Sequence, residues 1–281
     1  MSSLRAASAL ILVVAAVSLV IAYAAELDAL LTALAGNPGG SVGVWLDAAI
    51  TAFIILLAFA GSILLRQPLA SGGKSRALAI AALPVGLIAP AIVLALAAAA
   101  GAATLSEGKF AGFALFLGGS LLIVAKALGE EFLFRGLLQP LLCRAWGVPA
   151  GIALASLAFT VIHVVGGWRD PVSLLNITLA GVWFGLLAWR TGGISAPILA
   201  HAGYNWAEEM LFGASPNPGT GAFGALFDVD LVGPARLGGS IEGLNASLLL
   251  TAVLVAIMVP LILRHPFAGA AKAKQNKTGQ D

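Results

Sequence analysis

Apolar runs long enough to cross a lipid bilayer recur along the whole 281-residue sequence. A transmembrane helix needs about 20 predominantly apolar residues. Runs of this kind, separated by Gly- and Pro-containing connections, lie at about 6–25, 46–65, 77–103, 110–135, 148–166, 173–189, 194–212 and 244–263. Only 10% of the residues are charged and 60% are apolar, which excludes both a disordered chain and an ordinary soluble enzyme. The sequence therefore predicts an all-α, polytopic membrane protein with about eight transmembrane helices.

Composition also limits the domain organisation and the partners. Residues 1–266 are expected to form a single transmembrane helical domain, followed by a basic cytoplasmic tail at 267–281. A net charge of +2 is too balanced for a nucleic-acid-binding protein, so the expected partner is the lipid bilayer. The single cysteine, Cys143, excludes an internal disulfide and is interpreted as inert packing. The oligomeric state is not indicated by any pattern in the chain.

Charges in the connections assign the sides of the membrane. With the N-terminus inside, the inner connections receive most of the basic residues, as the positive-inside rule requires. The inner basic residues are Arg5, Arg66, Lys74, Arg76, Arg144, Arg190, Arg264, Lys272, Lys274 and Lys277, and the outer ones are Lys109, Arg169 and Arg236. We expect a multi-pass protein of the cytoplasmic (inner) membrane with both termini in the cytoplasm.

Two segments leave alternatives open. Residues 1–25 resemble a signal peptide, but their apolar run is longer than usual, so a retained span is favoured. Residues 213–243 form a long Gly/Pro-rich outer connection that is either a partly re-entrant cap or a packed surface loop. Glu208 and Glu209, just before it, are interpreted as topology or solubility residues.

Four charged residues fall inside the fourth span, where no connection can hold them: Lys126, Glu130, Glu131 and Arg135. Each charge costs about 2.5–3.5 kcal/mol at the centre of a membrane helix. One structural explanation is a pair of i,i+4 salt bridges, Lys126–Glu130 and Glu131–Arg135, and another is a position at the membrane interface. The functional explanation is a buried polar site.

Two histidines support the functional explanation. His163 lies in the fifth span and His201 in the seventh, where Asn205 shares its helix face. Spans four and five are expected to form a hairpin at Gly147, and Glu131 and His163 each lie 16 positions from that turn, so they should reach the same depth. A carboxylate and an imidazole can activate water, while a second imidazole and an amide can stabilise an oxyanion.

A metal site is an alternative use of the same residues. Glu130, His163 and His201 could supply three ligands to zinc or another divalent metal ion. No His-Glu-x-x-His motif is present. The residues alone do not choose between a metal ion and metal-free water, so no cofactor is assigned with certainty.

Three motifs together resemble those of the CPBP family, the CAAX prenyl protease and bacteriocin-processing (Abi) intramembrane proteases. They are Glu130-Glu131-x-x-x-Arg135, Phe159-x-x-x-His163 and His201-x-x-x-Asn205, within a core region at 110–212. Asn205-Trp206 and the segment 238–243 look like features of a bacterial branch.

The resemblance implies an eight-helix endopeptidase with a buried polar cavity open toward the cytoplasmic side. By that similarity Glu130 is the water-activating base with His163 as its partner, Glu131 and Arg135 support the site, and His201 and Asn205 stabilise the oxyanion. The substrate would be a peptide or a membrane-associated protein. The alternatives are a non-catalytic membrane partner or self-immunity protein of the same fold, and a transporter or proton relay.

Overall fold

The computed structural model describes residues 3–35, 41–67, 69 and 76–263. The predicted tail at 267–281 lies outside the described residues, as do the basic residues Lys74, Arg264, Lys272, Lys274 and Lys277. Helices account for nearly all of the regular structure, which confirms the all-α membrane fold.

Eight helical segments in the described part of the chain correspond to the eight predicted spans. They are α1 (Ser3–Ala35), α2 (Ser41–Leu64), α3 (Arg76–Ala99), the continuous series α4 (Phe113–Glu131), η1 (Phe132–Leu138) and α5 (Gln139–Trp146), α6 (Val148–Val165), α7 (Pro171–Thr191), α8 (Ser195–Trp206) with η2 (Ala207–Leu211), and α9 (Leu248–Leu263). Six of them are long and apolar enough to cross a membrane: α1, α2, α3, the α4–α5 series, α6 and α7. The protein is therefore a multi-pass membrane protein.

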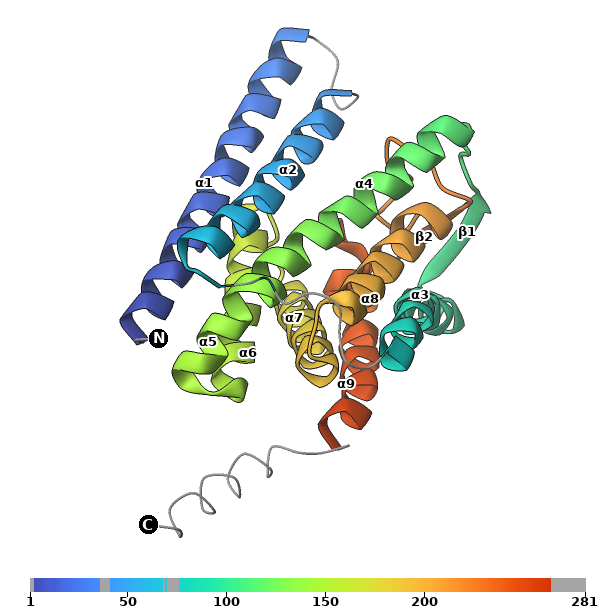
Figure 1. Ribbon diagram of the computed structural model, residues 1–281. Coiled ribbons are helices and arrows are strands. Elements are labelled where there is room, and N and C mark those ends of the chain that lie inside the picture. The colour runs from blue at the N-terminus through green and yellow to red at the C-terminus, as the bar shows by residue number, and fades with distance from the viewer. Residues whose placement is uncertain (1–2, 36–40, 68, 70–75, 264–281) are drawn as a thin grey trace, which may run out of the picture.

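The helices form two packed groups (Figure 1). Residues of α1, α2, η1, α5 and α6 build one apolar core, and residues of α3, α7, α8 and α9 build most of the other. Helix α4 contacts α2 on one side and α8 on the other, so it joins the two groups. Helix α1 packs through Ala6, Ala9, Val13 and Val17, while retention of residues 1–25 stays a prediction.

Helix ends follow from local sequence. The hairpin between α5 and α6 turns at Gly147, whose positive φ of 86° suits glycine, which confirms the predicted turn. Asp170 caps α7 by accepting hydrogen bonds from the N–H groups of Val172 and Ser173.

Span four differs from the prediction. The helix was expected to end at Arg135, but it continues to Trp146 through the π-helical segment η1, which carries Arg135. Such π-segments often occur at functional sites because they rotate the side chains that follow relative to a regular α-helix.

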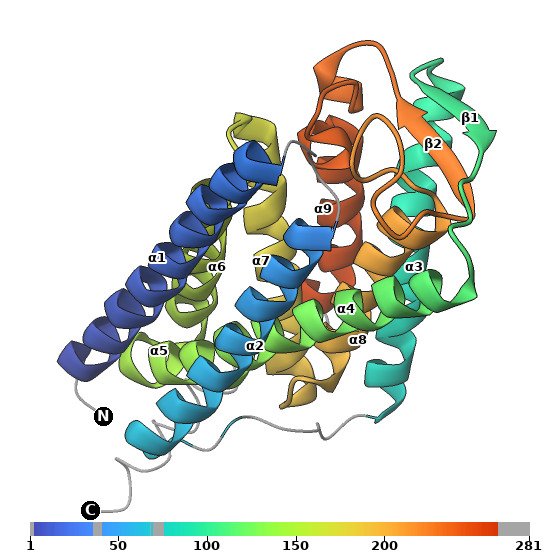
Figure 2. The ribbon, with the colours of Figure 1, turned by 90° about the horizontal axis from the view of Figure 1, so that it is seen from above.

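The long connection between α8 and α9 is an ordered cap. Its strand β2 (Phe227–Leu231) pairs antiparallel with β1 (Ala103–Glu107), with Ala103 opposite Leu231. Two short 3₁₀ helices follow, η3 (Ala235–Leu237) and η4 (Gly243–Ala246). Figure 2 shows the paired strands near one end of α3. The cap segment, defined as residues 212–247, thus has more structure than either alternative for 213–243 predicted.

Candidate active site

Three helical segments bring the predicted site residues together. The α4–η1 junction supplies Glu130, Glu131 and Arg135, α6 supplies His163, and α8 supplies His201 and Asn205. Close packing of small residues positions α8, because a side chain at Gly86 of α3 would clash with the carbonyl oxygen of Ala200. The residue next to His201 is therefore held against α3.

Glu131 is the centre of a buried ion-pair network. Its Oε1 accepts a hydrogen bond from Nη1 of Arg135 at 2.9 Å and lies 3.0 Å from Nδ1 of His201. Arg135 also donates through Nη2 to the carbonyl oxygen of Gly181 on α7 at 3.1 Å. Glu131 is 0% exposed and Arg135 is 1% exposed. The predicted Glu131–Arg135 salt bridge is confirmed, and its burial makes it an anchor of the site.

The other predicted salt bridge is wrong. Lys126 does not pair with Glu130; its Nζ lies 3.0 Å from Oδ2 of Asp47 on α2. Side chains from different helices compete for the same lysine, and sequence spacing within one helix does not reveal the competitor. Glu130 is thereby left to interact with His201, whose Nε2 lies 3.9 Å from its Oε2.

His163 presents one nitrogen to the site. Its Nδ1 lies 2.8 Å from the carbonyl oxygen of Phe159. A carbonyl oxygen can only accept, so Nδ1 carries a proton and donates it in this bond. In the neutral ring, Nε2 is then an acceptor. His163 is therefore arranged to accept a hydrogen bond or a proton.

Aromatic rings fix both imidazoles. Phe159 lies 4.4 Å from His163 between ring centroids, and Phe184 stacks on His201 at 4.6 Å with an interplanar angle of 18°. The guanidinium carbon of Arg135 lies 4.7 Å from the centre of the Phe159 ring. These contacts restrict ring rotation and favour the buried cation.

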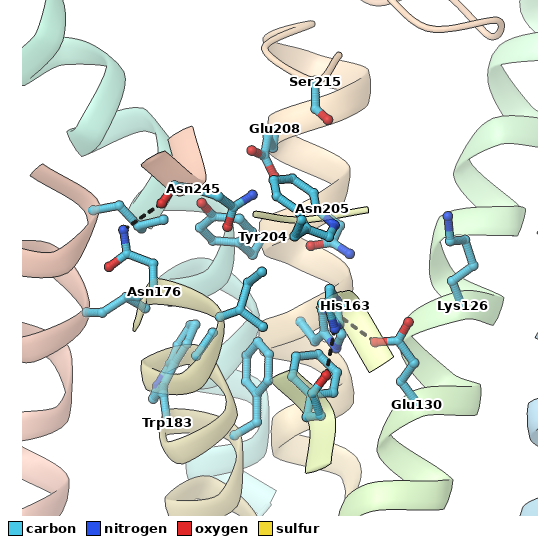
Figure 3. Close-up of a pocket in the computed structure, with 18 of the residues that line it drawn as sticks. Lys126, Glu130, His163, Asn176, Trp183, Tyr204, Asn205, Glu208, Ser215 and Asn245 are labelled. Atoms are coloured by element: carbon cyan, nitrogen blue, oxygen red, sulfur yellow. Dashed lines mark hydrogen bonds and ion pairs between the residues drawn. The ribbon is translucent and has the colours of Figure 1, made fainter. Parts of the chain in front are cut away.

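A cavity of about 230 Å³ receives these groups. Figure 3 shows Glu130 and His163 on one side of the close-up, with Asn205 and Tyr204 above them. The polar and charged lining residues are Lys126, Glu130, His163, Asn176, His201, Tyr204, Asn205, Glu208, Glu209, Ser215 and Asn245. Because a water occupies about 30 Å³ in the liquid, this volume accommodates several waters or a short part of a peptide.

Depth matching identified the wrong glutamate of the adjacent pair. Glu131 and His163 were expected to meet, but Glu131 is turned toward Arg135 and His201, and it is Glu130 that lines the cavity with His163. Neighbouring residues on a helix point about 100° apart. Counting residues from the turn compares the depths of two residues in the membrane, but it does not show in which direction their side chains point.

The sequence interpretation also missed two cavity residues. Glu208 was taken as a topology or solubility residue, but it is 6% exposed and lines the cavity together with Glu209. The available signal was spacing, since Tyr204 and Glu208 are i,i+4 on the helix that carries His201.

The cavity extends toward the cap. Its lining reaches Trp168 in the turn between α6 and α7, and Ser215 and Asn245 in the cap segment. The start of α1 lies at the other end, where Ala6 belongs to the same core as Leu141 and Leu142 of α5. The cap side of the cavity and the N-terminal end of α1 thus lie at opposite ends of the molecule. Two expectations therefore conflict, because a cytoplasmic N-terminus places the cap side of the cavity away from the cytoplasm.

The described residues contain no group of three or more His, Cys, Asp or Glu side chains arranged to hold a metal ion. The set Glu130, His163 and His201 does not fit a three-ligand metal site in this arrangement. Metal dependence stays an untested alternative.

Comparison with known proteins gives a family match for the core of the chain. Residues 110–207 match a family model described as type II CAAX prenyl endopeptidase Rce1-like. The matched segment contains all three sequence motifs and ends two residues after Asn205. No curated protein and no solved structure matches the chain.

Proposed function

Because its core, residues 110–207, belongs to the Rce1-like family of type II CAAX prenyl endopeptidases, we propose that this membrane protein is an intramembrane endopeptidase. The substrate is a peptide or a membrane-associated protein, and the nucleophile is water. The family relationship supports a protease of the CAAX type, while the chemistry and the substrate are the proposal.

One observation carries the proposal: Glu130, His163, His201 and Asn205 line a single cavity. They come from three helices and include a carboxylate, two imidazoles and an amide. These are the groups that amide hydrolysis by activated water requires. The buried Glu131–Arg135 pair supports these cavity residues, because Glu131 contacts His201 directly.

Water activation is assigned to Glu130 and His163. The Glu130 carboxylate takes a proton from water as the water oxygen attacks the carbonyl carbon of the scissile amide. His163 accepts a hydrogen bond from the same water through Nε2, since its Nδ1 is occupied by the carbonyl of Phe159. The result is a tetrahedral intermediate with negative charge on the former carbonyl oxygen.

Oxyanion stabilisation is assigned to Asn205 and His201. The Asn205 amide donates a hydrogen bond to the oxyanion. His201 lies between Glu131 and Glu130, where Glu131 holds Nδ1 and leaves Nε2 on the side of the ring that is assigned to the oxyanion. The proton taken by Glu130 then passes to the leaving nitrogen, the C–N bond breaks, and a carboxylic acid and an amine are released.

Zinc or another divalent ion is the alternative to metal-free water. Chelator treatment of the purified protein distinguishes the two. The proposal expects cleavage to persist after metal removal, whereas a loss of cleavage that zinc restores would contradict the metal-free mechanism.

Location and orientation belong to the same proposal. The charge distribution of the connections supports the cytoplasmic membrane with both termini inside. In that orientation the cap and the adjoining part of the cavity are on the non-cytoplasmic side. We therefore revise the cytoplasmic opening expected from the family resemblance and propose that substrate reaches the site from the cap side.

A comparison of membrane proteomes tests the function. Cells with the wild-type chain and cells with Glu130→Ala should differ in at least one new protein terminus, which only the wild type generates. Identical termini would contradict the peptidase assignment. Unchanged termini together with a wild-type phenotype of Glu130→Ala/His163→Ala cells would favour a non-catalytic partner, and pH-dependent flux in proteoliposomes would favour a transporter.

A further inference from the structure

The cavity wall continues beyond Asn205 with two acidic residues. The π-helical segment η2 follows α8 without a break and carries Glu208 and Glu209, both of which line the cavity. In Figure 3, Glu208 lies near Tyr204 and below Ser215 of the cap. No step of the proposed hydrolysis uses these two carboxylates.

Glu208 is a buried carboxyl group that faces the cavity without a partner. It is 6% exposed, and the described residues provide it with neither a salt bridge nor a side-chain hydrogen bond. The hydroxyl of Tyr204, one helical turn earlier, is also buried without a hydrogen-bond partner among them. A buried carboxylate is costly unless a cation or hydrogen-bond donors compensate it, so the site favours an incoming positive group.

The balance of charge around the cavity points the same way. Its lining contains the carboxyl groups of Glu130, Glu208 and Glu209 and one lysine, Lys126. That lysine is already paired with Asp47. Because Glu131 and Arg135 neutralise each other behind the wall, the carboxyl groups of the lining outnumber its unpaired cationic side chains.

We propose that Glu208, supported by Glu209 and the hydroxyl of Tyr204, is a specificity subsite that binds an ammonium or guanidinium group of the substrate. The group is a lysine or arginine side chain or a free N-terminal amine. An ammonium donates to the Glu208 carboxylate and to the Tyr204 oxygen, which satisfies both unpaired groups. The identity of the ligand as a peptide rests on the proposed peptidase function.

Helix geometry locates the subsite relative to the scissile bond. Glu208 is seven residues after His201, which corresponds to roughly 10 Å along the helix axis. An extended peptide covers that distance in about three residues. The basic group is therefore expected within about three residues of the scissile bond.

Binding can be measured apart from cleavage. The full chain carrying Glu130→Gln, in nanodiscs, is titrated with fluorescent peptides in which one lysine is moved through seven consecutive positions. Each has a counterpart with norleucine, which keeps the length and removes the charge. N-acetylated versions of all peptides separate a side chain from a terminal amine.

The proposal expects one lysine position, or the free amine, to bind about tenfold more tightly than its neutral counterpart. Adding Glu208→Gln should remove that preference, and Glu208→Asp should retain part of it. The matched control is Glu107→Gln, because Glu107 is an exposed acidic residue of β1 that does not line the cavity. This control should keep the full preference.

Two results would overturn the subsite: no peptide binding more tightly than its neutral counterpart, or a preference that persists in folded Glu208→Gln protein. Should Glu208→Gln fail to fold, Glu209→Gln serves in its place, with a partial loss expected and an unchanged preference counting against the proposal. Cleavage assays with the chain that retains Glu130 distinguish failure of the peptidase proposal from failure of the subsite proposal. Glu208-dependent binding without cleavage of any peptide contradicts the peptidase function alone, and cleavage without a charge preference contradicts the subsite alone.

Discussion

The carboxylate of Glu131 lies 3.0 Å from Nδ1 of His201 although the two residues are 70 positions apart. The same oxygen accepts the hydrogen bond from Arg135. A single buried atom thus connects the α4–η1 junction to α8, which means that the position of His201 depends on the ion pair behind it. Disturbing that pair should affect both stability and the site.

Replacing Arg135 with methionine should destabilise the protein by about 3–5 kcal/mol, because it leaves the Glu131 charge buried and uncompensated. Thermal unfolding in detergent measures the loss. Glu131→Leu/Arg135→Met should recover much of the stability without activity, since no unpaired charge is left but His201 has lost its anchor. A single Arg135→Met variant as stable as the wild type would contradict this role.

Lys126→Met is the control for that experiment. It also removes a cation from the same helical series, but the Lys126–Asp47 pair is 36% and 49% exposed. Exposed pairs contribute about 0–1 kcal/mol, so the unfolding midpoint should change little.

Gly86→Ala should lower stability by about 1–3 kcal/mol because the added carbon would clash with the Ala200 carbonyl oxygen, and backbone cannot move aside without shifting α8. Activity should fall with it, since Ala200 precedes His201. Gly118→Ala is the matched helix control, because nothing lies within 4 Å of its added carbon. Equal unfolding midpoints for the two variants would rule out the close α3–α8 contact.

Asp170 should make stability depend on pH in the acidic range. Partial burial alone would raise its pKa, but hydrogen bonds from Arg236 and from the N–H groups of Val172 and Ser173 outweigh it, so the pKa lies below its usual 3.8. The stabilisation is therefore complete above pH 3.8 and is lost as pH falls through the lower folded-state value. Asp170→Ala should cost about 1 kcal/mol at neutral pH, and the difference from wild type should shrink in acid unfolding measurements. A difference that is constant with pH would contradict the cap.

Orientation can be read from cysteine labelling in intact cells. In a Cys143→Ser background, Ala222→Cys in the exposed part of the cap should react with a membrane-impermeant maleimide, because the charge distribution places the cap outside. Arg144→Cys, exposed at the opposite end, should react only after the cells are opened. The reverse pattern would place the cap and its side of the cavity in the cytoplasm.

Local patterns predicted most of the helices because long apolar runs and Gly or Pro breaks determine them residue by residue. The i,i+4 pair Glu131–Arg135 was accessible for the same reason. Contacts between distant segments could not be predicted from local patterns. Lys126 pairs with Asp47 on another helix, and β1 pairs with β2, which lies about 120 residues later in the chain. Burial of Glu208 depends on how the cap and α8 enclose the cavity, which no local periodicity encodes.

The direction of adjacent side chains was also outside the reach of sequence. Glu130 and Glu131 have the same chemistry and nearly the same depth, yet one lines the cavity and the other is sealed behind it. Their distinct roles come from the rotation between successive residues and from the π-segment that begins immediately after them.

The most direct test of the central claim is the turnover of an unlabelled peptide or membrane-protein substrate by purified wild-type and Glu130→Gln protein. The substitution keeps the size of the side chain and removes its ability to take a proton. With equal unfolding midpoints for the two proteins, the account predicts a loss of about 10²–10⁴-fold in kcat. Wild-type turnover by folded Glu130→Gln protein would contradict it.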